Sequence, residues 1–333
     1  FFLPVQSHSG LVVLDSFDSP DSGLTQPHGL AFDGAYLWCA GYDNDTIYKL
    51  NASGNIISSF DSPGSSPTGL TFDGNYLWST DDGSLRIYKI DTSTGDVIES
   101  FEAPGTDSTG LTFDGTYLWN ADFNWGYPFG LVHKVDISGN FVTSFVSPGT
   151  APEGLAFDGS YLWHADIGEN KIYQLDMSGN VITSTTSPVP TPIGLTFDGT
   201  YLWVASSSER KIYKMGILPN PDIKANGSDG PVGLTHSDTL SVTIELDPGS
   251  YSGFQADWWV LADAPFGWYY YDAGTEEWLP GFHVSYQGPL FNLTPPVEAL
   301  NVSDLPMGGY TFYFGIDGNR NGNLDEPLYS DSV

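Results

Sequence analysis

The chain has 333 residues, and its 41 Asp and Glu against 10 Lys and Arg give a formal net charge of −31 at pH 7. This charge excludes nucleic acids as partners, because phosphate backbones bind to basic protein faces, and it excludes an anionic membrane surface for the same reason. No segment is long and apolar enough to predict a membrane-spanning helix. The single cysteine, Cys39, rules out an internal disulfide framework, and we interpret it as a small buried hydrophobic residue.

A ten-residue phrase is repeated five times in the first two thirds of the chain. Its first copy reads Gly29-Leu-Ala-Phe-Asp-Gly-Ala-Tyr-Leu-Trp38, and the others occupy residues 69–78, 110–119, 154–163 and 194–203. The copies begin 40 to 44 residues apart. A period near 40 residues with four short strands per repeat is typical of the blades of a β-propeller.

The second copy shows how one repeat is expected to fold. Residues 67–72 alternate and predict the inner strand, and residues 76–78 begin the second strand. Residues 86–90 and 97–101 predict the third and outer strands. The dipeptide Asp73-Gly74 between the first two strands is a strong hairpin signal. We interpret the aspartates and tryptophans of the phrase as structural, because Asp favours turns and large rings fill the space between packed sheets.

The fifth repeat lacks an outer strand of its own. Residues 211–215 predict its third strand, but the proline-rich stretch 218–222, which we expect to be a linker, follows directly. The missing strand is found near the start of the chain, where residues 12–20 match the outer strand of the first repeat, residues 56–63. We therefore expect a five-bladed β-propeller over residues 11–218, closed by the N-terminal strand so that no blade edge is left open.

Residues 222–333 do not contain the phrase and predict a second domain. Strands are expected at residues 240–246, 256–261, 268–271 and 310–315, separated by turns rich in Gly, Pro and Asp. Several short strands at this spacing predict an antiparallel β-sandwich of immunoglobulin-like size. No helix of normal length is expected in either part, so the fold class is all-β.

One stretch of the second domain has the pattern of a calcium-binding loop. Side-chain oxygens recur at alternate positions around the glycine of a sharp turn. The expected Ca²⁺ ligands are Asp317, Asn319, Asn321, Asn323 (through its backbone carbonyl) and Asp325. The twelfth position is Leu328 and not the glutamate of a helical EF-hand, so the pattern is closer to the short calcium loops in hairpins of extracellular β-proteins. A plain Asn/Gly hairpin turn is the alternative.

Two sets of equivalent repeat positions are expected to surround the ends of the propeller channel. The residues just before the phrase are His28, Thr68, Thr109, Glu153 and Ile193, and those three after its tryptophan are Gly41, Asp81, Asp122, Asp166 and Ser206. His28 and Glu153 lie two blades apart and are candidates for holding a divalent metal at the channel mouth, with Asp81, Asp122 and Asp166 as further candidates. Polar, hydrated loop ends are the alternative. No catalytic triad motif, phosphate-binding glycine loop or zinc-ligand spacing accompanies them.

An insertion in the third repeat, residues 122–130, carries three aromatic residues. They are Trp125, Tyr127 and Phe129. Exposed aromatic residues at the tip of a loop predict a recognition surface for a sugar ring or a neighbouring protein. Packing of the same residues over the edge of the blade is the alternative.

Residues 1–10 precede the closing strand and form an apolar arm. Its apolar residues are Phe1, Phe2, Leu3 and Val5. Packing of this arm into a neighbouring subunit, by strand addition or in a groove, would give a head-to-tail polymer, and removal of residues 1–9 would abolish assembly. The arm could equally pack on its own second domain.

The pattern Gly-Leu-Thr-Phe-Asp-Gly-Thr-Tyr-Leu-Trp followed by Lys-Ile-Tyr-Lys, over residues 11–216, resembles the propeller repeats of exported bacterial and archaeal proteins. These are related to the NHL, gluconolactonase-like and glutamine-cyclotransferase-like propellers. Residues 222–333, with Ala256-Asp-Trp-Trp and Pro265-Phe-Gly-Trp-Tyr-Tyr-Tyr, resemble a β-sandwich module that follows varied domains in such proteins. The resemblance implies a fold and not a function, since propellers include enzymes, lectins and structural proteins. The metal ligands of the enzymatic relatives do not map onto this chain, which speaks against an enzyme.

The sequence therefore favours a non-enzymatic protein that is extracellular or at the cell surface after removal of an export signal. We expect it to be stabilised by Ca²⁺ and to act as a self-assembling filament or surface-layer subunit or as an adhesive protein, with copies of itself, a surface protein or a glycan as partner. Near-identical blades are the reason, because an enzyme usually breaks the symmetry of its repeats at one site. A carbohydrate-binding propeller and a metal-dependent propeller enzyme of the lactonase or lyase type are the alternatives.

Overall fold

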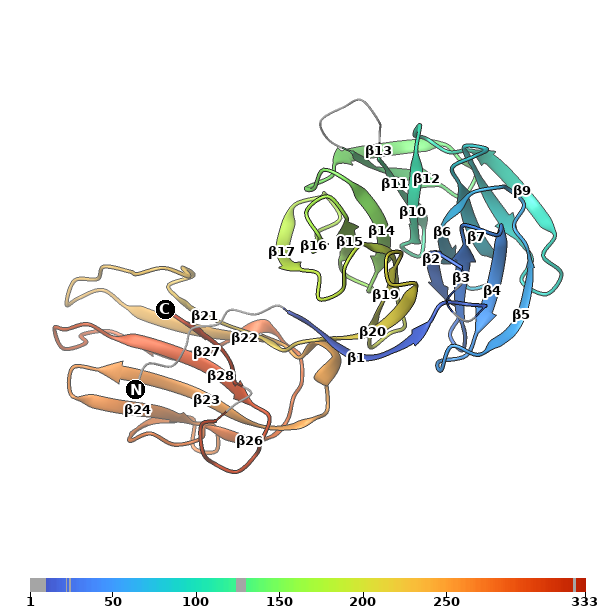
Figure 1. Cartoon of the computed structure of the whole chain (residues 1–333). Helices are drawn as coiled ribbons and strands as arrows, with labels where there is room; N and C mark the ends of the chain where they lie inside the picture. Colours follow the sequence, from blue (N-terminus) through green and yellow to red (C-terminus); the bar gives the residue numbers. More distant parts are fainter. Residues whose placement is uncertain (1–9, 22, 24, 124–129, 326–327) are drawn as a thin grey trace. The chain divides into compact units, whose positions relative to one another are not determined.

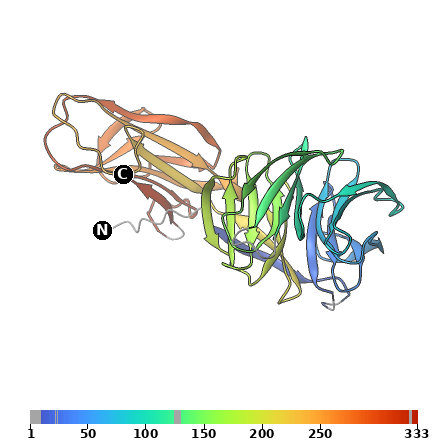
Figure 2. The ribbon, with the colours of Figure 1, turned by 90° about the horizontal axis from the view of Figure 1, so that it is seen from above.

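The computed structural model describes residues 10–21, 23, 25–123, 130–325 and 328–333. The chain divides into two compact units, which we call the repeat unit (Leu11–Gly216) and the C-terminal unit (Ile217–Val333). Figures 1 and 2 show their strands from two directions. The described residues contain no α-helix, and their one 3-10 turn is η1 (Gly249–Tyr251). No helix among them is long and apolar enough to cross a membrane.

Four of the five repeats form four-stranded antiparallel sheets from consecutive strands. The first sheet contains β2 (Pro27–Phe32), β3 (Leu37–Gly41), β4 (Thr46–Leu50) and β5 (Ile56–Asp61) in that order. The next three sheets, in the same order, contain β6 (Pro67–Phe72), β7 (Leu77–Asp81), β8 (Arg86–Ile90) and β9 (Val97–Glu102); β10 (Ser108–Phe113), β11 (Tyr117–Asp122), β12 (Leu131–Asp136) and β13 (Phe141–Val146); and β14 (Pro152–Phe157), β15 (Leu162–Asp166), β16 (Lys171–Leu175) and β17 (Val181–Thr186). These repeated sheets fit a β-propeller, as the sequence period predicts.

The sheet of the fifth repeat includes the first strand of the chain. Its order is β1 (Leu11–Asp18), β20 (Lys211–Ile217), β19 (Leu202–Ser206) and β18 (Pro192–Phe197). The Phe17 ring of β1 lies 6.0 Å from the Trp203 ring of β19. In the first repeat the rings of Phe60 and Trp38 are 5.9 Å apart, so β1 packs in its sheet as an outer strand does in its own.

The glycine that begins each phrase lies where neighbouring inner strands approach most closely. The contacts run from β2 to β6, β6 to β10, β10 to β14, β14 to β18 and β18 to β2. A Cβ atom at Gly29 would lie 2.6 Å from the carbonyl oxygen of Thr68, and one at Gly194 would lie 1.8 Å from that of His28. Only glycine allows backbones to come this close.

The C-terminal unit contains two sheets that share one hydrophobic core. The smaller sheet has the order β21 (Asn220–Ala225), β22 (Leu240–Asp247) and β27 (Leu293–Val302). The larger has the order β25 (Glu277–Pro280), β24 (Gly267–Asp272), β23 (Gln255–Ala264), β28 (Thr311–Asp317) and β29 (Leu328–Ser332), with β26 (Tyr286–Pro289) also paired to β23. The core includes Val242, Leu246 and Phe314, which are fully buried.

Strand β21 begins inside the proline-rich stretch 218–222, where the sequence alone suggested a linker. Proline is compatible with this position because β21 is at the edge of its sheet, where a missing N–H breaks no ladder hydrogen bond. The N–H of Ile223 donates to a side-chain carboxylate oxygen of Asp331, on β29, at 3.0 Å. The edge of β21 is therefore protected by prolines and by a side chain.

Candidate functional site

The aspartate of every phrase has a structural role, because its carboxylate accepts hydrogen bonds from its own hairpin. One carboxylate oxygen of Asp73 accepts the N–H groups of Asn75 and Tyr76, and the other accepts the indole N–H of Trp78 at 2.8 Å. The same aspartate–tryptophan hydrogen bond occurs in all five repeats; its other aspartates are Asp33, Asp114, Asp158 and Asp198. Each phrase is thus a hairpin turn fastened to a buried tryptophan.

The aspartates at the ends of the second strands also stabilise loops. Asp81, Asp122 and Asp166 are buried. Asp81 accepts the backbone N–H groups of Ser66 and Ser84, both at 2.7 Å, so it joins the loop before its inner strand to the turn after its second strand. A Cβ atom at Gly64 would lie 2.1 Å from the Asp81 carboxyl carbon. The Pro-Gly pair before the inner strand therefore lets the loop close over the carboxylate.

His28 lies at the start of β2 and is held among neighbouring side chains. Its ring stacks on that of Tyr42, with 4.3 Å between ring centroids. Burial lowers the pKa of His28 to about 4, and the nearby Asp43 carboxylate only partly opposes this shift. The imidazole is therefore neutral at pH 7 and is able to act as a hydrogen-bond partner or as a metal ligand, but not as a cation.

Glu153 lies at the start of β14 in a strongly acidic environment. Burial, together with the charges of the Asp107, Asp166 and Asp82 carboxylates, raises its pKa to about 8. Asp107 itself has a pKa raised to about 6, through burial and through the charge and hydrogen bond of Asp82. Of these three neighbours only Asp166 was a candidate from the sequence, because Asp82 and Asp107 come from loops of two other repeats.

The inner strands leave no open channel at their centre. The space between them, lined by the phrase glycines together with Thr68 and Ile193, has a volume of about 0 Å³ for a water molecule. Any ligand of His28 or Glu153 must therefore bind outside this narrow centre. Among the residues that the structure describes, no three His, Cys, Asp or Glu side chains are gathered closely enough to hold a metal ion as they stand.

The expected calcium loop follows β28 and is closed by hydrogen bonds of its own. Asp317 is buried and accepts the N–H groups of Asn319 and Asp325 at 2.8 and 2.9 Å. The amide groups of Asn319 and Asn321 donate to the two oxygens of Asp325. Burial raises the pKa of Asp317, whereas these two amides lower the pKa of Asp325. If the side-chain amides of Asn319 and Asn321 rotated, their carbonyl oxygens would lie where their N–H groups now lie.

A further carboxylate reaches the same loop from another strand. Asp257 of β23 is fully buried and lies directly opposite Asp317 of β28 in the sheet. Its two oxygens accept the side-chain amide of Gln287 at 2.8 Å and the N–H of Gly322 at 2.6 Å. Sequence reasoning missed Asp257 because it lies 60 residues before Asp317, and only the strand pairing brings them together.

Two groups of candidate residues lie outside the described residues. These are the aromatic loop residues Trp125, Tyr127 and Phe129 and the arm residues Phe1, Phe2, Leu3 and Val5. Both remain predictions from the sequence.

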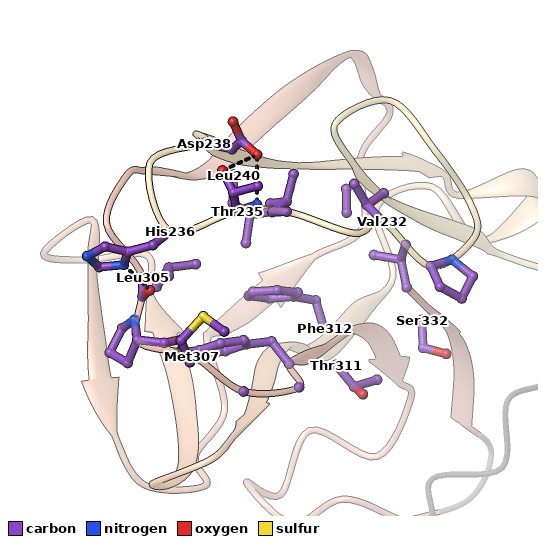
Figure 3. Close-up of a pocket in the computed structure, with 18 of the residues that line it drawn as sticks. Val232, Thr235, His236, Asp238, Leu240, Leu305, Met307, Thr311, Phe312 and Ser332 are labelled. Atoms are coloured by element: carbon purple, nitrogen blue, oxygen red, sulfur yellow. Dashed lines mark hydrogen bonds between the residues drawn. The ribbon is translucent and has the colours of Figure 1, made fainter.

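The C-terminal unit has a pocket that the sequence did not predict. It has a volume of about 580 Å³ and lies between the loop before β22 and the loop before β28. Figure 3 shows Leu240, Phe312 and Met307 among the side chains around it. The ring Nδ1 of His236 and the carbonyl oxygen of Leu305 are 3.1 Å apart and join the two loops. The size is that of a small-molecule site, but the described residues hold no cluster of reactive groups there.

Comparison with known proteins supports the fold. No family model and no curated protein matches this chain. Among solved structures, the glutaminyl cyclase of Myxococcus xanthus is similar with a TM-score of 0.53 and 11% identity, over 62% of this chain and 95% of that one. Virginiamycin B lyase of Staphylococcus aureus has 25% identity and a TM-score of 0.40 over 60% and 68% of the two chains, and a nidogen/laminin complex has 18% and 0.44 over 56% and 73%. These neighbours are propeller proteins, and the first establishes the likeness of fold alone.

Proposed function

We propose that this chain is a non-enzymatic structural protein of the cell exterior, stabilised by Ca²⁺ and assembling with copies of itself. Its proposed parts are an arm over residues 1–10, a five-bladed β-propeller over residues 11–218 and an immunoglobulin-like β-sandwich over residues 222–333. The sheet order that joins β1 to β20 supports closure of the propeller by the N-terminal strand. The contact between β18 and β2, the inner strands of the last and first repeats, supports it as well.

The observation that carries this proposal is the use of the repeated polar residues. The phrase aspartates bind tryptophan indoles, and the second-strand aspartates bind backbone amides of their own loops. Carboxylates used in this way stabilise the fold, and they leave little capacity for binding a substrate or a catalytic metal. The repeats thus supply a rigid body with a filled centre, which suits a structural component. The charge of −31 suits an exterior rich in divalent cations.

The role of calcium is supported by the pair Asp257 and Asp317. Asp257 and Asp317 are both buried and lie opposite each other in the sheet, and neither is paired with a basic side chain within the described residues. A hard divalent cation at the loop would bind the carboxylate and amide oxygens that such ions prefer. The ligands we propose are Asp317, Asn319, Asn321, Asn323 and Asp325, with Asp257 as an additional carboxylate near the ion. Two Asn in place of Asp imply the weak affinity that suits millimolar calcium.

Thermal unfolding with millimolar Ca²⁺ and then with EDTA tests the calcium site. We expect Ca²⁺ to raise the Tm of the wild type but not that of Asp317→Asn. Asp272→Asn is the matched control, because Asp272 is a turn aspartate of the same unit that accepts the Gly274 N–H. An equal response of Asp317→Asn and the control would contradict the site.

Negative-stain microscopy and light scattering under the same two conditions test assembly. Ordered filaments or sheets that dissolve with EDTA support the proposal. Discrete monomers in both conditions would refute self-assembly and redirect the search to glycans.

A metal-dependent enzyme is the second candidate, and one observation favours it. Glu153 stands where two other repeats carry Thr68 and Thr109, and it lies near Asp82 and Asp107 at the same end of the inner strands. This breaks the symmetry of the repeats in the way that an active site would. Anomalous diffraction from crystals grown with Mn²⁺ tests it, since the enzyme hypothesis requires an ion beside Glu153 and the structural hypothesis requires none.

A further inference from the structure

The pocket of the C-terminal unit opens from its hydrophobic core (Figure 3). Leu240 and Phe312 belong to that core, are 5% and 4% exposed, and also line the pocket. Other lining side chains are apolar but face solvent: the exposed fractions of Val232, Leu234 and Met307 are 36%, 38% and 82%. A concave apolar site of about 580 Å³ with a solvent-exposed rim is the kind of surface at which proteins bind a partner or a ligand.

The apolar surface extends beyond this pocket into a smaller one of about 210 Å³. The two share Leu305 and Phe312, and the smaller one is also lined by Phe266 and Trp278. Phe266 is 67% exposed, and every residue that lines the smaller pocket is apolar or aromatic. Two adjoining apolar pockets suit a segment with several apolar side chains in a row better than they suit a single side chain.

The charges around the larger pocket select against an acidic occupant. Asp229 and Asp238 line it, and none of the described residues that line it is Lys or Arg. A segment that carried a carboxylate would be repelled there, which disfavours much of a chain with 41 Asp and Glu. Residues 1–9 contain no Asp or Glu, and they include the four apolar residues of the arm. The arm therefore matches the pocket both in apolar character and in charge.

The arm is attached to the C-terminal unit at a point from which it reaches the pocket. The N–H of Leu218 donates to the carbonyl oxygen of Gly10 at 2.9 Å, and Gly10 is grouped with this unit. Seven residues lead from Leu218, through β21, to Ala225, which lines the pocket. Leu3 is also seven residues from Gly10. An extended chain spans at most about 3.6 Å per residue, so each segment covers at most about 25 Å, and residues 1–3 can enter the pocket of their own chain.

We propose that this pocket binds the arm of the same chain through the side chains of Phe1, Phe2 and Leu3. A tethered segment has an effective concentration of the order of millimolar, so at lower protein concentrations the arm outcompetes the arms of other copies. Side chains rather than backbone pairing make the contact, because Pro4 has no N–H and the N–H of Ile223 at the edge of β21 is already bonded to a carboxylate. Binding of the arm in its own chain does not depend on self-assembly.

NMR of the full-length protein with ¹³C-labelled methionine methyl groups tests occupation of the pocket, because the chain has only three methionines. We expect the Met307 resonance to move in Leu3→Asp, since a carboxylate does not stay in an apolar pocket. The resonances of Met177 and Met215, which belong to the repeat unit, should not move. Ser9→Asp is the matched control, because it adds the same charge outside the apolar part of the arm. An unmoved Met307 resonance in Leu3→Asp, or an equal movement in Ser9→Asp, would overturn the proposal.

Disulfide trapping identifies which chain supplies the arm. Leu3→Cys combined with Met307→Cys should give a linked monomer under mild oxidation, at least about ten times more of it than Leu3→Cys combined with Phe254→Cys. Phe254 is the control position, because it is 57% exposed in the same unit but does not line the pocket. Cys39 is buried and does not compete. Linked dimers in place of linked monomers would overturn binding in the same chain and assign the arm to a neighbouring copy. Equal linking of the two pairs, or no linking, would overturn the pocket as the site of the arm.

Discussion

The carboxyl of Glu153 gives a quantitative prediction of pH dependence. Its pKa is about 8 in the folded protein, against 4.5 ordinarily, because of burial and the neighbouring Asp107, Asp166 and Asp82. The folded chain therefore holds a proton that the unfolded chain releases above about pH 4.5. Stability from this group is fully present below that pH, and the free energy of unfolding falls as the pH rises to about 8.

The magnitude follows from the size of the shift. At about 1.4 kcal/mol per pKa unit, the change from 4.5 to about 8 corresponds to at most about 5 kcal/mol. Glu153 is partly exposed, so water screens some of this, and we expect about 2 to 4 kcal/mol. The variant Glu153→Gln removes the charge but keeps the shape. It should match the wild type near pH 4 and be more stable by this amount at pH 9.

Urea unfolding at pH 4, 6, 7.5 and 9 measures the difference between the wild type and Glu153→Gln. Glu99→Gln is the control, because Glu99 lies on the exposed outer strand β9. NMR of protein with ¹³C-labelled glutamate carboxyls measures the titration of Glu153 directly. The resonance that is lost in Glu153→Gln should titrate near pH 8 in the wild type. Parallel pH profiles of the wild type and Glu153→Gln, or a titration near pH 4.5, would refute the reasoning.

Three further substitutions test how the repeat unit is held together, each by urea unfolding and near-UV circular dichroism. Gly194→Ala adds a methyl group 1.8 Å from the His28 carbonyl oxygen and should destabilise the protein by at least about 3 kcal/mol; a neutral result would mean that the first and last inner strands are not packed as described. Phe17→Ala removes the ring that lies against Trp203 and should lower the free energy of unfolding by about 2–4 kcal/mol. An unchanged free energy of unfolding would contradict the packing of β1 in the sheet of the fifth repeat. Asp73→Ala leaves a buried indole N–H unpaired and should cost about 1–3 kcal/mol; if Asp73→Ala and wild type unfold alike, the aspartate–tryptophan bond is not stabilising.

The strands of the repeats were predictable from the sequence because their signals are local. Alternating apolar residues and the Asp-Gly turn within the phrase placed the inner strand of the second repeat at residues 67–72, and β6 spans Pro67–Phe72. The same signals predicted repeated four-stranded sheets, which the structure contains. The period of the phrase sufficed because each sheet is built almost entirely from consecutive strands.

The second unit was less fully predicted because its pairings are not local. The strand positions near residues 240–246 and 310–315 were confirmed by β22 and β28. The prolines of stretch 218–222, however, suggested a linker where β21 begins. Proline is tolerated in an edge strand but not in a central strand. Whether a strand lies at the edge is set by the order of strands in the sheet, which the sequence does not show.

The candidate sites depended most on tertiary structure. The sequence alone selected Asp317 from a loop pattern, and Glu153 from its place among the equivalent repeat positions at the expected channel mouth. It did not select Asp257, which faces Asp317 only through the pairing of β23 with β28, nor Asp107 and Asp82, which raise the pKa of Glu153. Sequence determines local turns and alternation, whereas burial and the distances between charges are set by how distant strands pack. That packing determines the pKa values of the candidate residues and which residues surround them.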